Sequence, residues 1–249
     1  MSALLRSELL KQRSTRTALG LFAAMVGLVL LAVLVHTLGL PAEDLSRTDL
    51  QLMVFGRGEF LSVLFAALLG AMSVTAEIRH GTIRPTFLVT PRRGRIVAAK
   101  VSVSVVIGAG FGLVGGAVAA AAGTVALHAR GIDVQLDARD YLLLVAGSTA
   151  AAALWAAIGV GLGALVRNQV PALIGICALL LFVEGLLAGD VGGGLGDVGR
   201  LLPGAAASAI SGQDPGELLA PAVGLGLLAA YAAAAALAGL LAISRRDVG

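Results

Sequence analysis

The stretch ALGLFAAMVGLVLLAVLVHTLGL, residues Ala18–Leu40, contains no Asp, Glu, Lys or Arg. A helix that crosses the hydrocarbon core of a membrane needs about 20 largely apolar residues, because the core is about 30 Å thick and each residue adds 1.5 Å. The stretch is longer than the roughly 7 to 15 apolar residues of a secretory signal peptide, and more apolar stretches follow it. We therefore predict that Ala18–Leu40 is a retained membrane span.

The whole chain has the composition of a membrane protein. Of its 249 residues, 58% are hydrophobic and 13% are charged, and the mean hydropathy is +0.95, whereas soluble proteins have about 25% charged residues. Five more stretches qualify as spans: Phe60–Ala76, Val101–Leu127, Tyr141–Val166, Val170–Gly189 and Leu218–Ile243. The predicted fold is an all-α integral membrane protein with six transmembrane helices, in which residues 1–17 form an interfacial helix and residues 18–249 the membrane domain.

The basic residues predict the orientation of the spans, because Lys and Arg in short loops favour the cytoplasmic side. With both termini inside, the cytoplasmic segments hold 13 of the 18 Lys and Arg, and the outer segments hold most of the acids, Glu59 among them. Sixteen arginines against two lysines, with abundant Ala and Gly, are typical of a GC-rich bacterial genome. We therefore expect a multi-pass protein of a bacterial plasma membrane with both termini cytoplasmic.

The most basic segment is EIRHGTIRPTFLVTPRRGRIVAAK, residues Glu77–Lys100, in the predicted cytoplasmic loop between the second and third spans. Any cytoplasmic loop is expected to be basic, but this one also has four apolar residues between its charges: Ile83, Phe87, Leu88 and Val89. The amphipathic period of Thr82–Thr90 favours a short helix at the membrane surface, ended by Pro91. Such a helix would provide a binding surface for a partner protein. The alternative is an ordinary basic loop without a partner.

Two other segments outside the spans carry local patterns. In residues 1–17, Leu5 and Leu9 share one helical face and Arg6 is available to lipid phosphates, which predicts an interfacial helix; an ordinary positive flank is the alternative. Residues 190–217 are Gly-rich and then apolar at Leu201–Ile210, a piece too short to span. We expect a short outer re-entrant hairpin broken near Pro203, with a disordered glycine loop as the alternative.

The sequence lacks the residue patterns of common enzymes. His36, His80 and His128 lie in different segments, so no two share a helical face at metal-ligand spacing. A phosphate-binding loop needs Gly-Lys followed by Ser or Thr after a strand, and neither Lys11 nor Lys100 has that context. We expect no catalytic residue, no bound cofactor and no metal in this chain, and therefore not an enzyme.

Glycines recur at four-residue spacing inside two predicted spans. Gly108, Gly112 and Gly116 repeat along one face of the third span, and Gly159 and Gly163 along one face of the fourth. Small residues at this spacing let helix backbones approach closely in lipid. We expect these faces to pack within the chain, with dimerisation as the alternative.

Glu184 is the one acid deep within a predicted span. A charged side chain there costs roughly 2.5 to 3.5 kcal/mol on insertion scales, so it should face protein or water and is a functional candidate. The alternative is structural, in which Glu184 marks where the fifth span breaks before the outer segment.

The basic segment resembles the cytoplasmic loop of ABC-2 type permeases, the membrane subunits of ATP-binding cassette transporters. Their pattern runs E-x-x-x-G-T, then T-P-x-R, then a lysine that leads into the next span. The matching positions are Glu77, Gly81, Thr82, Thr90, Pro91, Arg93 and Lys100. SELLKQRSTRTALG, residues 7–20, is similar to the helix before the family's first span, and GRLLPGAAASAISG, residues 199–212, to its outer segment before the last span.

The resemblance implies a half-transporter whose motor is a separate chain. Two such permease subunits pair, as homodimer or heterodimer, and each docks a cytoplasmic P-loop ATPase through this loop, which acts as a coupling helix. ATP and Mg would bind the partner ATPase. The coupling residues implied are Glu77, Arg79, His80, Gly81, Thr82, Thr90, Pro91, Arg92, Arg93 and Lys100. Membrane lipid is a further expected partner, and nucleic acid is not.

We therefore predict a permease subunit of an ABC exporter that moves a hydrophobic or amphipathic substrate through the dimer interface. The outer loops lack obvious sugar-stacking aromatics and the chain has one tryptophan, Trp155, which favours a hydrophobic substrate over a glycan. A membrane scaffold or assembly protein that docks a non-ATPase partner is the alternative. An intramembrane enzyme would need a catalytic partner for Glu184, and its own span offers none.

Overall fold

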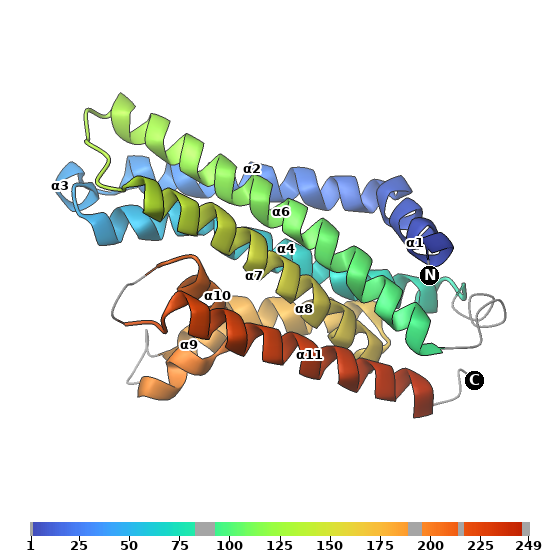
Figure 1. Ribbon diagram of the computed structural model, residues 1–249. Coiled ribbons are helices and arrows are strands. Elements are labelled where there is room, and N and C mark those ends of the chain that lie inside the picture. The colour runs from blue at the N-terminus through green and yellow to red at the C-terminus, as the bar shows by residue number, and fades with distance from the viewer. Residues whose placement is uncertain (1, 83–92, 189–195, 214–216, 246–249) are drawn as a thin grey trace.

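The computed structural model describes residues 2–82, 93–188, 196–213 and 217–245. The described chain is built from helices (Figure 1). In chain order they are α1 (Ser2–Ser14), α2 (Arg16–Gly39), α3 (Ala42–Leu45), α4 (Thr48–Arg79), α6 (Arg93–Ala129), α7 (Ala138–Val166), α8 (Gln169–Ala178), the π-helix η1 (Leu179–Val183), α9 (Glu184–Ala188), the 3-10 helix η2 (Gly196–Leu201), α10 (Pro203–Ile210) and α11 (Pro221–Arg245).

Six helical segments in the described residues are long and apolar enough to cross a membrane. They are α2, α4, α6, α7, the continuous run from α8 to α9, and α11. The prediction of an all-α membrane protein with six transmembrane helices is confirmed. The six lie side by side as one bundle, and α1 and the last turns of α11 lie at the same end of it (Figure 1).

The bounds of the helices differ from those of the predicted spans. The largest difference is at α4, which begins at Thr48 although the apolar stretch begins at Phe60. Arg57 and Glu59 gave the intervening segment the composition of an outer loop, but the carboxylate of Glu59 is buried inside the bundle, 2% exposed. A buried carboxylate is tolerated where side chains donate hydrogen bonds to it, and Gln213 does so over 3.0 Å.

Helices α4 and α7 form the centre of the bundle. α7 packs against α4, α6 and α11, and its Trp155 is fully buried. Few of the residues of α2, of the α8–α9 run and of α11 are buried inside the bundle. Exposed apolar side chains on outer helices are expected where lipid replaces water as the solvent.

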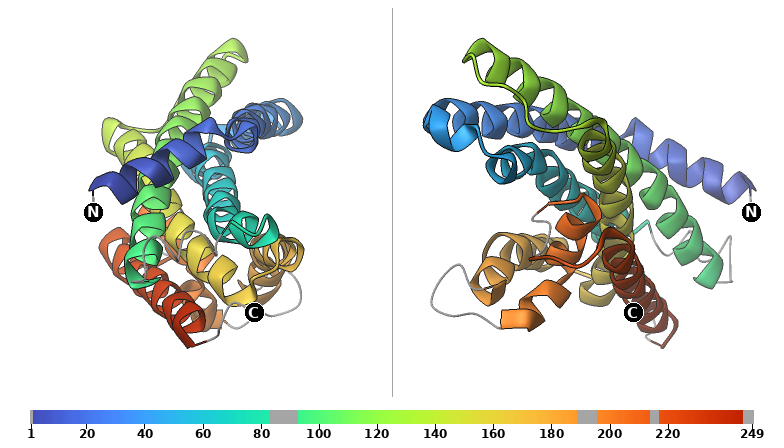
Figure 2. Two further views of the ribbon diagram at one scale, coloured as in Figure 1. Left: turned by 90° about the vertical axis from the view of Figure 1, so that its right-hand side faces the viewer. Right: turned by 60° about the vertical axis from the view of Figure 1, so that its left-hand side comes forward.

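The two ends of the bundle differ. At one end, which holds the N-terminus in Figure 1, α1 runs across the ends of the spans, as the left view of Figure 2 shows. At the other end the buried amide of Gln51 holds two loops together, because its Nε2 donates to the carbonyls of Leu45 and Asp133, over 2.8 and 2.9 Å, and its Oε1 accepts from the Gln135 N–H. We call these the α1 end and the α3 end.

The α3 end also holds the short helices after the fifth span. The chain breaks at Leu202, whose backbone is extended, and Pro203 begins α10. Proline suits the first position of a helix because its missing N–H would be unpaired there anyway. α10 packs against α4, α7 and α11, with Ala206 and Ala207 buried. Residues 190–195 and 214–216 of the predicted hairpin lie outside the described residues.

Candidate functional site

Four charged side chains meet at the α1 end of the bundle. Glu8 and Lys11 come from α1, Glu77 from the last turns of α4, and Lys100 from the beginning of α6. Each lysine Nζ lies within 2.9 Å of a carboxylate oxygen of each glutamate. The four residues therefore form a closed ring of ion pairs, which we call the ion-pair cluster.

Three members of the ion-pair cluster are withdrawn from solvent. The side chains of Lys100, Glu8 and Glu77 are 3%, 2% and 12% exposed, and that of Lys11 is 45% exposed. Buried charges are tolerated when they are paired and hydrogen-bonded. Two carboxylates and two ammonium groups sum to zero, so burial leaves no net charge in the cluster.

The electrostatic balance of the ion-pair cluster favours the charged forms. Burial alone would raise the pKa of Glu8, but attraction by Lys100 and hydrogen bonds from Lys11 and Lys100 outweigh it, so the pKa lies below its ordinary value. Burial lowers the pKa of Lys11, but its hydrogen bonds to Glu8 and Glu77 outweigh that effect and raise the pKa. The ring of charges is therefore held together at neutral pH.

Further hydrogen bonds join the same three helices. Lys100 Nζ donates to the carbonyl oxygen of Ser73 in α4 over 3.0 Å. The amide of Gln12, one turn after Glu8 in α1, donates to Ser104 Oγ in α6 over 3.2 Å. Helix α1 is thus attached to both helices that flank residues 80–92.

Helix α4 ends in a hydrogen-bonded turn at Gly81. The N–H of Gly81 donates to the carbonyl of Ile78 over 3.2 Å, and that of Thr82 to the carbonyl of Glu77 over 3.0 Å. Gly81 has a φ of +69°, which this type of helix ending requires and which glycine adopts without strain. The Glu-x-x-x-Gly-Thr sequence therefore places one charge in the ion-pair cluster and then stops the helix.

A pocket of about 670 Å³ opens beside the ion-pair cluster, between α1, α2 and α4. Its wall is mixed in character, because charged and amide side chains lie next to apolar ones from α2 and α4. We call it the α1–α2–α4 pocket. The lining residues are Glu8, Lys11, Gln12, Thr15, Thr17, Ala18, Leu21, Leu69, Met72, Ser73, Ala76, Glu77, Arg79, His80, Thr82, Lys100 and Gln169.

A comparison with protein families gives this geometry its context. The model of the ABC-2 family transporter protein matches residues 4–184, most of the chain and all four members of the ion-pair cluster. The chain belongs to the ABC-2 transporter family. It is therefore a membrane subunit of an ABC transporter, a class whose ATP-binding subunit is in general a partner. A search among curated proteins found no match.

The ABC-2 coupling residues predicted from the sequence lie in different places. Some belong to the ion-pair cluster, some lie at the ends of α4 and α6, and the others lie outside the described residues. Glu77 and Lys100 face each other within the ion-pair cluster. Arg79, His80, Gly81 and Thr82 are exposed at the end of α4. Arg93 begins α6. Thr90, Pro91 and Arg92, with Ile83, Phe87, Leu88 and Val89 of the predicted surface helix, lie outside the described residues, so their part in coupling stays a prediction.

Glu8 and Gln12, the two buried polar residues of α1 in the described chain, were not predicted as site residues from the sequence. Leu5 and Leu9, which were predicted to share one helical face, are both half-buried. Glu8 is the one acid in the first 17 residues. A lone acid in a basic segment, one helical turn from Gln12, was the available signal.

At the α3 end of this ABC-2 chain, Glu184 lies at the junction of η1 and α9 and is 8% exposed. The N–H groups of Gly204 and Ala205, in the first turn of α10, face its carboxylate. A carboxylate is favoured at a helix N-terminus because the helix dipole is positive there. Gly204 permits this approach, since an added Cβ would overlap Glu184 Oε2. This geometry supports the structural interpretation of Glu184.

The predicted glycine faces lie against neighbouring helices of the same chain. A Cβ added at Gly112 would overlap the carbonyl oxygen of Ser148 in α7, and Gly108 and Gly116 face the same helix. Gly159 and Gly163 in α7 face the backbone of α4 at Ala67 and Ala71. These glycines therefore serve contacts within the chain.

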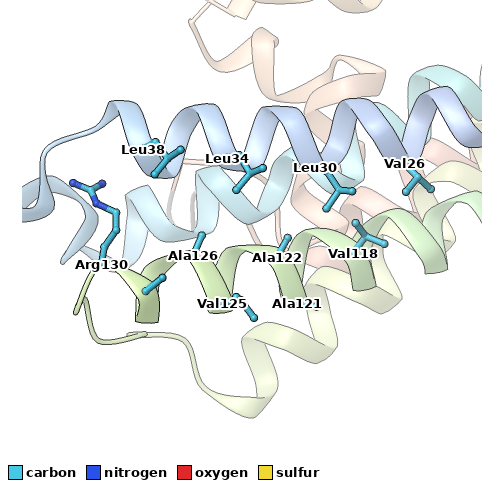
Figure 3. Close-up of a pocket in the computed structure, with 11 residues that line it drawn as sticks. Val26, Leu30, Leu34, Leu38, Val118, Ala121, Ala122, Val125, Ala126 and Arg130 are labelled. Carbon is cyan, nitrogen blue, oxygen red and sulfur yellow. The ribbon is translucent and has the colours of Figure 1, made fainter.

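A second hollow, of about 730 Å³, runs between α2 and α6 towards the α3 end (Figure 3). Leu30, Leu34 and Leu38 point from α2 towards α6. Arg130 lies at its end, where its guanidinium donates to the carbonyl of Leu40 over 2.9 Å. The groove is otherwise apolar, and in a membrane such a groove is filled by lipid or by another helix.

Proposed function

We propose that this ABC-2 chain is the permease subunit of an exporter, in which a separate ATPase docks at the α1 end and a second permease subunit completes the pathway. ATP and Mg bind the ATPase, and the substrate is hydrophobic or amphipathic. The permease spans a bacterial plasma membrane with its α1 end in the cytoplasm. The observation that carries the proposal is the ion-pair cluster, which joins both helices that flank residues 80–92.

The ion-pair cluster supports a role in transmitting force. A motor that moves the segment after α4 can pass that movement on only if the helices next to the segment are rigidly connected. Because Glu77 and Lys100 are joined at 2.9 Å and both contact α1 residues, the ends of α4 and α6 and the whole of α1 would respond as one body. A displacement at this end would then reach the centre of the bundle through α4.

The docking surface proposed for the ATPase begins at the exposed end of α4. Arg79 and His80 are exposed there, and exposed Arg95 lies near the start of α6. Basic surfaces attract acidic partners, which raises the rate of association and fixes orientation. These side chains are therefore candidates for direct contact, whereas Glu77 and Lys100 act by supporting them.

The proposed orientation and the proposed substrate class are each supported by one surface feature. The exposed basic residues at the α1 end support a cytoplasmic position for it, because arginine is retained on that side. The apolar groove between α2 and α6 supports an apolar surface for the second permease subunit or for the substrate. A glycan would need polar and aromatic contacts that this groove lacks.

Copurification tests the proposal. The full-length chain is extracted in mild detergent from its own host, as wild type and with Arg79→Glu and His80→Glu, and bound proteins are identified by mass spectrometry. We expect a P-loop ATPase with the wild type and at least about tenfold less with the double variant, since two charges of the wrong sign oppose docking. Arg139→Glu, an exposed arginine near the α3 end, is the matched control and should retain the ATPase.

The outcome also separates the proposal from the scaffold alternative. A wild-type chain that retains another protein, and no ATPase, would contradict the transporter assignment of this subunit. Loss of the ATPase in the Arg139→Glu variant as well would show that the effect is not local to the α1 end. ATP hydrolysis by the copurified complex, stimulated by an apolar compound, would then identify the substrate class.

A further inference from the structure

The α1–α2–α4 pocket contains buried hydrogen-bond acceptors that the described residues leave unpaired. Gln12 is 8% exposed, and its Oε1 has no hydrogen-bond partner. Glu77 uses Oε1 for both lysines of the ion-pair cluster, while its Oε2 is buried without a partner. Both residues line the pocket. Buried acceptors without donors are unfavourable, so the pocket is suited to a ligand that brings N–H groups.

The same pocket offers groups that favour an anion. Helix α2 begins at Arg16, and its N-cap residue Thr15 makes no side-chain hydrogen bond to the first turn. Thr15 and Thr17 line the pocket, so the N-terminus of α2 is at its wall. The first N–H groups of a helix lack intrahelical acceptors and attract phosphate. Exposed Arg79 and His80 also line the pocket and add positive charge.

Another part of the pocket wall is apolar. Leu21 comes from α2, and Leu69 and Met72 come from α4. A volume of about 670 Å³ lies within the roughly 300 to 1,000 Å³ of small-molecule sites. The pocket is therefore suited to a single ligand that combines an N–H donor, a phosphate and an apolar portion.

We propose that the α1–α2–α4 pocket binds the headgroup of an ethanolamine phospholipid from the surrounding membrane. Its phosphate lies at the N-terminus of α2, near Arg79, and its ammonium group donates to Gln12 Oε1 and Glu77 Oε2. The first part of its acyl chains covers Leu21, Leu69 and Met72. A resident lipid at this place completes the contact between α1 and α4, independently of what the transporter carries.

A comparison of two lipids tests the proposal. The full-length chain, purified in detergent and washed free of lipid, is titrated with micelles that contain dioleoyl phosphatidylethanolamine or dioleoyl phosphatidylcholine, and bound lipid is counted by native mass spectrometry. The two headgroups share the phosphate, but the trimethylated nitrogen of choline has no N–H to donate. We expect the ethanolamine lipid to bind about tenfold more tightly, as loss of hydrogen bonds from a charged donor implies.

Substitutions locate the binding. Gln12→Met removes one of the two acceptors at similar volume and should reduce the tenfold preference while leaving choline-lipid binding unchanged. Thr17→Trp places an indole at the pocket wall and should weaken both lipids. Gln135→Met, an exposed residue at the α3 end, is the control and should change neither. If Gln12→Met fails to fold, Thr17→Trp and the two-lipid comparison still decide.

Three results would overturn the proposal. Equal affinity for the two lipids would show that the pocket does not select a headgroup with an N–H donor. Tighter binding of dioleoyl phosphatidylglycerol than of the ethanolamine lipid would identify a site for anionic lipid instead. Unchanged ethanolamine-lipid binding in both Gln12→Met and Thr17→Trp would place the lipid outside the pocket.

Discussion

Glu77 and Lys100, which lie on either side of residues 80–92, are joined by an ion pair of 2.9 Å. The two helices that carry them are therefore fastened together at the point where the proposed motor acts. Because Glu8 pairs with the same lysine, helix α1 belongs to this junction. The role proposed for α1, which is to connect the ends of α4 and α6, therefore rests on this contact and not on the basic residues on the surface of α1.

Removing Lys100 should destabilise the bundle strongly. Lys100→Met leaves Glu8 and Glu77 buried with one cation fewer, and breaking a buried ion pair costs about 3 to 5 kcal/mol. The double variant Lys100→Met with Glu8→Leu keeps the pair of Lys11 and Glu77 and should recover part of that loss. Thermal unfolding in detergent measures both variants. A double variant less stable than the single one would show that the charges of the cluster are not balanced against one another.

The stability of the α1 contact should depend on pH in the acid range. Because the pKa of Glu8 is lowered on folding, its contribution is fully present above the ordinary pKa of 4.5 and is lost as the pH falls through the lowered value. Unfolding temperatures of the wild type should therefore fall between about pH 5 and pH 3 more steeply than those of Glu8→Gln. Parallel curves for the two proteins would show that Glu8 is not the titrating group.

Substitution by alanine should affect the free energy of unfolding differently at two glycines of α6. A Cβ at Gly112 overlaps the Ser148 carbonyl oxygen, whereas a Cβ at Gly110 meets nothing within 4 Å. Gly112→Ala should lower the free energy of unfolding by about 1 to 3 kcal/mol, as overpacking does. Gly110→Ala should leave it unchanged or raise it by about 0.5 to 1 kcal/mol, because alanine favours a helix. Equal effects in thermal unfolding would contradict the close approach of α6 to α7.

The amide of Gln51 should be important for the α3 end. Gln51→Leu leaves the carbonyls of Leu45 and Asp133 and the N–H of Gln135 without their partner. Unpaired buried groups cost about 1 to 3 kcal/mol, so the unfolding temperature should fall measurably. Gln135→Leu, whose side chain is exposed, serves as the comparison and should have little effect.

Substitution of Glu184 distinguishes its two interpretations. Glu184→Gln keeps an oxygen that accepts from the first turn of α10, whereas Glu184→Leu removes it. If the residue is structural, the Gln variant should retain transport and stability in reconstituted vesicles, and the Leu variant should lose stability. Loss of transport in a stable Gln variant would show instead that the carboxylate itself is functional.

The sequence predicts the spans well because the thickness of a membrane sets the length of apolar sequence needed to cross it. It predicts the start of α4 poorly, because Glu59 is separated from its donor Gln213 by 154 residues. The same limit applies to the ion-pair cluster. The charge of Lys100 is visible in the sequence, but its partner Glu8 lies 92 residues away. Only the packed bundle shows that the two charges meet.

The attachment of α1 has a consequence for the order of assembly during synthesis. Glu8 and Gln12 leave the ribosome long before Lys100 and Ser104, with which they pair. Until the third span has been inserted, α1 has only Lys11 and Glu77 to complete its charges. The start of the chain therefore takes its final place late, because a nascent chain that ends before residue 100 lacks the lysine with which α6 pairs Glu8.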